Sequence, residues 1–211
     1  MDPIETLMTE LRRIVRALDA LEAFAGRVAR GEAAGRDEVG RFARFFAEYA
    51  DVRHHGKEED LLFATMVEAG FPKDAGPIAV MLHEHGIGRE AVGTLRRLAA
   101  GTGELAAADR TDLVEAATSY AAMLRAHIRK EDRILYPMAE AHLAPERFAA
   151  LAAAFDRFEA ERDGVAELLA LADQLSAAYP SEAPASSLKL NTKIGHGHGH
   201  GEGGCGACGG H

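Results

Sequence analysis

The sequence has no tryptophan, few aromatic residues and only two cysteines, both close to the C-terminus. Aromatic residues make up 6 % of the chain, whereas alanine is abundant between leucine, glutamate and arginine, and this composition favours helices over sheets. The two cysteines, Cys205 and Cys208, cannot provide a disulfide framework for the rest of the chain. We therefore expect an all-α protein without structural disulfides in its body.

Long hydrophobic runs and an excess of positive charge are also missing. No apolar run reaches the roughly 18 residues of a membrane-spanning helix, and residues 1–5 lack the basic, apolar start of a signal peptide. The formal net charge of −9 argues against a nucleic-acid partner, which needs a clustered basic face. We expect a cytoplasmic protein with no membrane and no nucleic-acid partner.

Apolar residues recur at helical spacing in four long segments that short loops separate. Asp2 and Asp37 are placed to cap the first two helices, and Pro137 is expected to kink the fourth. Four such segments predict an up-down-up-down four-helix bundle over residues 1–143. The four helices are expected over residues 3–30, 37–69, 77–100 and 110–143.

A further helical pattern follows the bundle. It runs from Pro145 to Ala178, with a break near Gly164, and we assign residues 144–179 to an additional C-terminal helical segment that packs outside the bundle or against its end. Residues 180–211 lose the apolar period. We expect them to form a flexible linker and a disordered tail, because such dense glycine does not order by itself.

The tail gathers histidine and cysteine among its glycines. Cys-x-x-Cys beside histidine can bind zinc, nickel or copper, which makes the tail a candidate second metal site. A single Cys-x-x-Cys in glycine is a weak motif, so a low-complexity end without a metal is the alternative. The residues concerned are His196, His198, His200, Cys205, Cys208 and His211.

Two polar residues interrupt the apolar face of the fourth helix. His127 and Glu131 are four residues apart, so they lie on one side of a helix, in a stripe with Leu124 and Leu135. A buried imidazole and carboxylate are costly unless something satisfies them. A metal ion would do so, and a hydrogen-bonded pair on an exposed face is the alternative.

The second helix repeats this pattern. Residues 54–63 align without gaps with residues 127–136, which pairs His54 with His127 and Glu58 with Glu131. The echo predicts a pseudo-symmetric site between the two helices.

The apolar face of the second helix favours a different pair. It places His55 and Glu59 towards the core, about 100° from His54 and Glu58. We take His54 and Glu58 as the first choice and His55 and Glu59 as the second, and Gly56 could mark a local distortion that reconciles them.

The third helix adds one more imidazole. His85 shares a core stripe with Met81 and Val92, whereas His83 falls off that stripe and should lie at the surface. Imidazoles and carboxylates inside a helical bundle suit iron or manganese. The body offers no thiolate, which argues against a structural zinc site.

These motifs resemble the hemerythrin-like, or HHE cation-binding, family. A His-x-x-x-Glu on the second helix, a His on the third and a His-x-x-x-Glu on the fourth occur in that family's order, and residues 76–85 also resemble the third helix of its bacterial iron-centre repair branch. The resemblance covers about residues 1–160 and implies a bundle with a non-haem di-iron centre. Carried over by position, the ligands would be His54, Glu58, His85, His127 and Glu131.

The chain departs from the family pattern at two positions. Leu11 stands where the family usually has a first-helix histidine, so water or substrate would fill the gap, or the site holds one metal, or it no longer binds. Glu10 lies about 100° round the helix and is not a substitute, whereas Tyr120 is a candidate donor for the gap. Arg89, four residues after His85, replaces the second histidine of the oxygen-carrying branch and disfavours that role.

The resemblance implies a non-haem iron protein with one or two ions that reacts with or senses dioxygen, peroxide or nitric oxide, in oxidative or nitrosative stress. Its partner would be this small oxidant or gas. An enzyme and a binding protein both fit, and no catalytic residue is assigned. The alternatives are a metal sensor, chaperone or iron-donating repair protein whose tail binds a metal, and a bundle without metal that serves only protein contacts.

Overall fold

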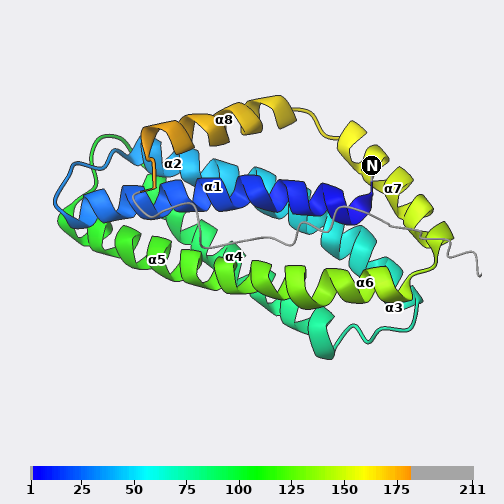
Figure 1. Ribbon diagram of the computed structural model, residues 1–211. Helices are drawn as coiled ribbons and strands as arrows, with labels where there is room; N and C mark the ends of the chain where they lie inside the picture. Colours follow the sequence, from blue (N-terminus) through cyan, green and yellow to red (C-terminus); the bar gives the residue numbers. More distant parts are fainter. Residues whose placement is uncertain (1, 182–211) are drawn as a thin grey trace, which may run out of the picture.

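The computed structural model describes residues 2–181, and all of its regular elements are helices (Figure 1). The all-helical bundle expected from the sequence is confirmed. The tail and most of the predicted linker lie outside the described residues. The elements, with η for π-helical segments, are α1 (Pro3–Ala29), α2 (Arg36–Phe45), η1 (Phe46–His55), η2 (Glu58–Phe63), α3 (Ala64–Glu68), α4 (Gly76–Ala99), α5 (Ala107–Lys130), η3 (Glu131–Leu135), α6 (Tyr136–His142), α7 (Pro145–Ala160) and α8 (Val165–Ala178).

Four long helical runs form the bundle. They are α1, the continuous run from α2 through η1 and η2 to α3, then α4, and the run from α5 through η3 to α6. Figure 1 shows that successive runs point in opposite directions along the bundle. Each run begins and ends within three residues of its expected bounds, because the apolar period and the flanking glycines mark helix ends locally.

The two predicted caps have different outcomes. The carboxylate of Asp2 accepts hydrogen bonds from the backbone N–H groups of Ile4 and Glu5, at 2.9 and 3.1 Å, as expected. The cap at Asp37 is wrong, because the second run begins one residue earlier, at Arg36. The Arg36 backbone N–H donates to the carbonyl of Gly103 and its guanidinium to Leu98 and Asp109, and these contacts set where the helix starts.

Wide π-helical turns occur in the middle of the second and fourth runs. η1 and η2 flank Gly56, so the distortion expected at this glycine is present. η3 ends two residues before Pro137, which has no backbone N–H to offer the helix. A π turn contains more residues than an α turn, so it changes which side chains face the core.

The C-terminal helices α7 and α8 cover the outside of the bundle next to α1 and the second run (Figure 1). The break between them falls at Gly164, whose φ of +83° is a left-handed conformation that favours glycine. After α8, the ring of Tyr179 packs against Phe24 and Phe42, with centroids 5.0 and 5.8 Å apart. These contacts attach the additional segment to the apolar core.

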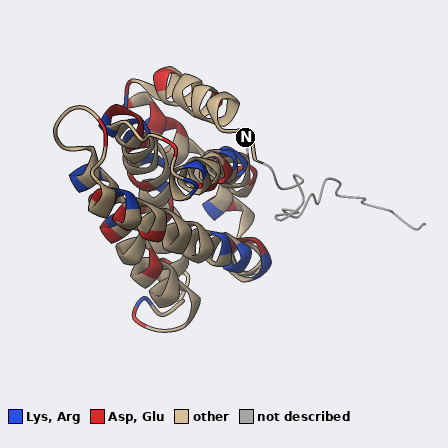
Figure 2. Cartoon of the chain, turned by 90° about the vertical axis from the view of Figure 1, so that its left-hand side faces the viewer, with Lys and Arg blue, Asp and Glu red and all other residues tan. Residues whose placement is uncertain are grey.

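Charged residues of both signs are interspersed over the bundle as seen from its end (Figure 2). Within residues 2–181, no helix has both the length and the apolar character needed to cross a membrane.

Candidate metal centre

Four imidazoles and two carboxylates meet in the core of the bundle, and none of these residues is more than 5 % exposed. The second run contributes three of them, α4 one and the fourth run two. Their potential ligand atoms form two groups, each within 4.8 Å, that share Glu58. One group contains His55, Glu58, His85 and His127, and the other contains His54, Glu58 and Glu131.

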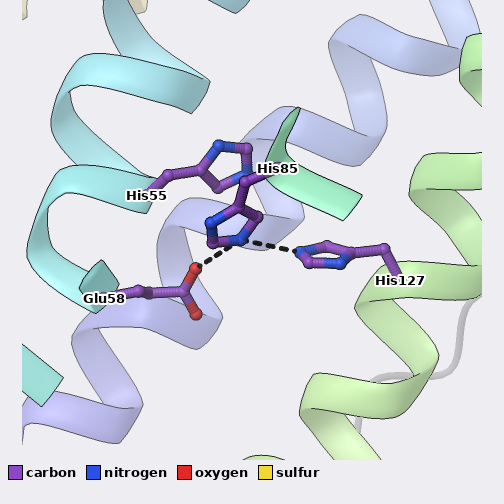
Figure 3. A group of neighbouring side chains, drawn as sticks. All are labelled: His55, Glu58, His85 and His127. Atoms are coloured by element: carbon purple, nitrogen blue, oxygen red, sulfur yellow. Dashed lines mark hydrogen bonds and ion pairs between the residues drawn. The ribbon is translucent and has the colours of Figure 1, made fainter. Parts of the chain in front are cut away.

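The first group is centred on His85 (Figure 3). Its Nε2 lies 3.4 Å from Oε2 of Glu58 and 3.2 Å from Nε2 of His127. The ring of His55 stacks on that of His85, with centroids 3.8 Å apart and planes at 13°. Three imidazoles and a carboxylate from three helical runs therefore surround one point.

The second group leaves its polar atoms unsatisfied. Among residues 2–181, six buried side-chain atoms have no hydrogen-bond partner, and four of them are Nε2 of His54, Oε2 of Glu58 and both carboxylate oxygens of Glu131. Nε2 of His127 is 2.8 Å from Oε1 of Glu131, without the geometry of a hydrogen bond. A buried polar atom without a partner costs about 1–3 kcal/mol. A metal ion would satisfy these atoms together, so the donor set fits one.

Each of the four histidines is held from behind by a carboxylate. This contact occupies Nδ1 and leaves Nε2 as the atom available to the centre, an arrangement typical of metal-binding histidines. The sequence did not identify these carboxylates as partners. The Nδ1 distances are 3.1 Å for His54 to Glu10, 3.3 Å for His55 to Asp51, 2.6 Å for His85 to Glu59 and 2.9 Å for His127 to Glu84.

Two lysines repeat one arrangement on opposite sides of the site. Lys57 is completely buried and donates to Oε1 of Glu10 at 2.6 Å, while Lys130 donates to Glu84. In each repeat a lysine three residues after the histidine binds the carboxylate that holds that histidine. The alignment of residues 54–63 with residues 127–136 also pairs Lys57 with Lys130, so the sequence contains a signal of this repeat.

One tyrosine, Tyr136, contacts the shared carboxylate, whereas Tyr120 and Leu11 do not add a donor to it. The hydroxyl of Tyr136 donates to Oε1 of Glu58 at 2.8 Å. Tyr120, the tyrosine considered from the sequence, instead packs edge-on against Phe46, with centroids 5.2 Å apart. Leu11 is 1 % exposed and brings only apolar atoms to the core.

The structure places both predicted histidines of the second run in the core but separates their carboxylates. Glu58 faces the centre, whereas Glu59 binds His85 from outside and also contacts Arg89. His83 is exposed, as expected. The sequence analysis offers His54 with Glu58, or His55 with Glu59, as alternative ligand pairs. In the structure both histidines and Glu58 face the centre, and Glu59 holds His85.

Neighbouring charges in the cluster shift the pKa values of His127 and Glu131 in the direction opposite to burial. Burial by itself lowers the pKa of His127, but the carboxylates of Glu131, Glu84 and Glu58 together outweigh burial and raise the pKa to about 10. Burial raises the pKa of Glu131, but the imidazoles of His127, His54 and His85 together outweigh burial and lower the pKa to about 2. Burial and the neighbouring His85 lower the pKa of His55 to about 3, which keeps this imidazole neutral.

A helical bundle that encloses imidazoles and unsatisfied carboxylates defines a class of metal-binding bundle proteins. The chain matches the model of the hemerythrin HHE cation-binding domain over residues 2–139 and again over residues 104–194. The protein therefore belongs to the hemerythrin HHE family, whose membership implies cation binding. Searches of curated proteins and of solved structures found no match.

Proposed function

We propose that the protein is a non-haem iron-binding protein whose buried centre reacts with or senses dioxygen, peroxide or nitric oxide. The proposed ligands are His54, Glu58, His85, His127 and Glu131. The observation that supports this best is the convergence of buried side-chain atoms of His54, Glu58 and Glu131 that have no hydrogen-bond partner. Bound iron would supply redox chemistry and affinity for small oxidants, since imidazole and carboxylate ligands suit it.

The chain would position and protect this centre. Carboxylates behind the histidines fix their orientation, and Tyr136 holds one oxygen of Glu58 so that the other faces the centre. The group of His54, Glu58 and Glu131 offers only three donors, and a metal held by three protein ligands keeps room for a small molecule. Leu11 is buried in the core and adds no donor to this group.

Metal analysis tests this proposal. We expect protein reconstituted with ferrous ion under argon to bind one or two irons per chain, and to develop near-ultraviolet absorption on exposure to air. His127→Ala should lose iron, because it removes one proposed ligand. The metal-free variant should also be less stable, because the buried Glu131 loses its nearest cation. His83→Ala, which changes an exposed histidine on α4, should retain the wild-type iron content. Wild-type protein that binds no iron, or His127→Ala that binds it fully, would contradict the assignment.

A second candidate is a metal sensor, chaperone or iron-donating repair protein that binds a metal without turnover. The Gly/His/Cys sequence of residues 195–211 favours it, because histidine and cysteine bind zinc, nickel or copper. In this proposal the tail would collect or deliver an ion, and the bundle would store or sense one.

A further inference from the structure

The second run carries one more buried imidazole than the family pattern requires. We propose that His55 is a metal ligand that supplies the imidazole absent at Leu11, and that Arg89 positions it together with His85. This inference rests on the proposed iron site and specifies how that site is completed. It accounts for both positions at which the chain departs from the family, Leu11 and Arg89.

His55 is placed as a ligand would be. It is 5 % exposed, and one of its ring nitrogens lies within 4.8 Å of the ligand atoms of Glu58, His85 and His127. Its Nδ1 faces Oδ1 of Asp51 at 3.3 Å, which leaves Nε2 for the centre. In Figure 3 its ring lies parallel to that of His85, on the same side of the group.

The local helix geometry explains how two consecutive histidines reach the core. In an α-helix, neighbouring side chains point about 100° apart, so one of the two would normally face away. η1 ends at His55, and its π turns hold more residues each, which narrows that angle. Both His54 and His55 are consequently buried, with their ring centroids 5.7 Å apart.

Arg89 ties together the carboxylates behind the two stacked rings. Its Nε donates to Oδ1 of Asp51 at 2.8 Å, and its NH2 group donates to Oε1 of Glu59 at 2.7 Å. Those same oxygens face Nδ1 of His55 and Nδ1 of His85. One planar guanidinium from α4 therefore sets the orientation of two imidazoles, a geometry that the single ammonium group of lysine cannot reproduce.

Because position 11 is leucine, the site lacks an imidazole that another helix would have to supply. α1 contributes no imidazole, and its nearest polar residue, Glu10, is used to hold His54 from outside. The His55 ring brings the first group to three imidazoles and a carboxylate without any ligand from α1. The chain thus replaces a ligand from one helix by a ligand from the next.

His55→Ala tests the ligand directly, with ferrous titration under argon and metal analysis as the readouts. We expect the variant to bind fewer irons per chain than wild type, or to bind iron at least about tenfold more weakly. Adding Leu11→His to this variant should restore the lost binding. Wild-type stoichiometry and affinity in His55→Ala, or no recovery in the double variant, would overturn the inference.

Arg89→Gln tests the positioning role, because Arg89 is 44 % exposed and its replacement leaves the core intact. We expect the metal-free variant to melt within a few degrees of wild type, but to bind metal about tenfold more weakly and, with cobalt(II) as a probe, to show an altered visible spectrum. Arg97→Gln, also on α4 and paired with Asp112 at 3.1 Å, is the matched control and should behave as wild type. An unchanged spectrum and affinity in Arg89→Gln would refute the role.

The wild-type titration separates the two levels of the proposal. If wild-type protein binds no ferrous iron, the proposed function itself fails. If wild type binds iron and both His55→Ala and Arg89→Gln bind it equally well, only the roles of His55 and Arg89 are refuted.

Discussion

At the scale of single residues, the centre contains two neighbouring groups of opposite charge, His127 and Glu131. His127 and Glu131 lie 2.8 Å apart and are buried, so in the metal-free protein each favours the charged form of the other. This pair makes the stability of the metal-free protein depend on pH. The pKa values of the two groups define the pH ranges over which stability changes.

The sign of that dependence follows from the direction of each shift. The pKa of His127 is raised from 6.5 to about 10, so its contribution is complete below pH 6.5 and is lost as the pH rises towards 10. The pKa of Glu131 is lowered from 4.5 to about 2, so its contribution is complete above pH 4.5 and is lost as the pH falls towards 2.

We therefore expect the melting temperature of chelator-treated protein to decline between pH 6.5 and pH 10. Glu131→Gln removes the carboxylate that raises the pKa of His127, so its melting temperature should vary less over the same range. Differential scanning calorimetry of both proteins provides the measurement. Parallel curves for wild type and variant would show that this pair does not govern the pH dependence.

At the scale of elements, α7 lies outside the bundle and is linked to the centre through intermediate residues. Glu159 pairs with the buried Lys57 and, at 2.6 Å, with Arg53. Arg53 also donates to the backbone carbonyls of Arg162 and Asp163, directly after α7. Because Lys57 also holds Glu10, which faces Nδ1 of His54, a chain of contacts connects α7 with a proposed ligand.

The contact between Gly56 and Phe158 fixes how closely α7 approaches the second run. A Cβ at position 56 would lie 2.9 Å from Cζ of Phe158, whose ring is covered by the Arg162 guanidinium at 3.4 Å from its centroid. We expect Gly56→Ala to destabilise the protein by about 1–3 kcal/mol through overpacking. This cost exceeds the gain of up to about 1 kcal/mol from alanine in a helix.

Gly93→Ala provides the matched control for that measurement by chemical denaturation. Gly93 lies within α4, and a Cβ there would meet no heavy atom within 4 Å. Its replacement should stabilise the protein by about 0.5–1 kcal/mol. If Gly56→Ala were as stable as Gly93→Ala, the close packing of α7 on the second run would not be a constraint.

At the scale of the whole molecule, the chain combines the enclosed centre with the tail of residues 195–211. We expect deletion of this tail to leave the iron content unchanged, because every proposed iron ligand lies within residues 54–131. The deletion should lower zinc or nickel uptake, since it removes four of the ten histidines and both cysteines. Equilibrium dialysis with each metal gives the measurement. Undiminished zinc and nickel uptake would remove the proposed role of the tail.

The positions of the helices, the family and most residues of the buried centre follow from the amino-acid sequence alone. Helical periodicity is a local property, so the apolar stripes located the four runs, and the i, i+4 spacing placed His127 and Glu131 on one face. The alignment of residues 54–63 with residues 127–136 pairs His54 with His127 and Lys57 with Lys130, but it does not show which residues the lysines contact.

Which side chains of the second run face the centre, and which residues hold them there, depends on tertiary packing. An ideal α-helix forces a choice between His54 and His55, and the π turns around Gly56 remove that choice. The contacts of Glu84 with His127 and of Arg89 with Asp51 depend on the register between helices far apart in sequence. The apolar periodicity of one helix carries no information about that register, because the register is set by how the helices pack against one another.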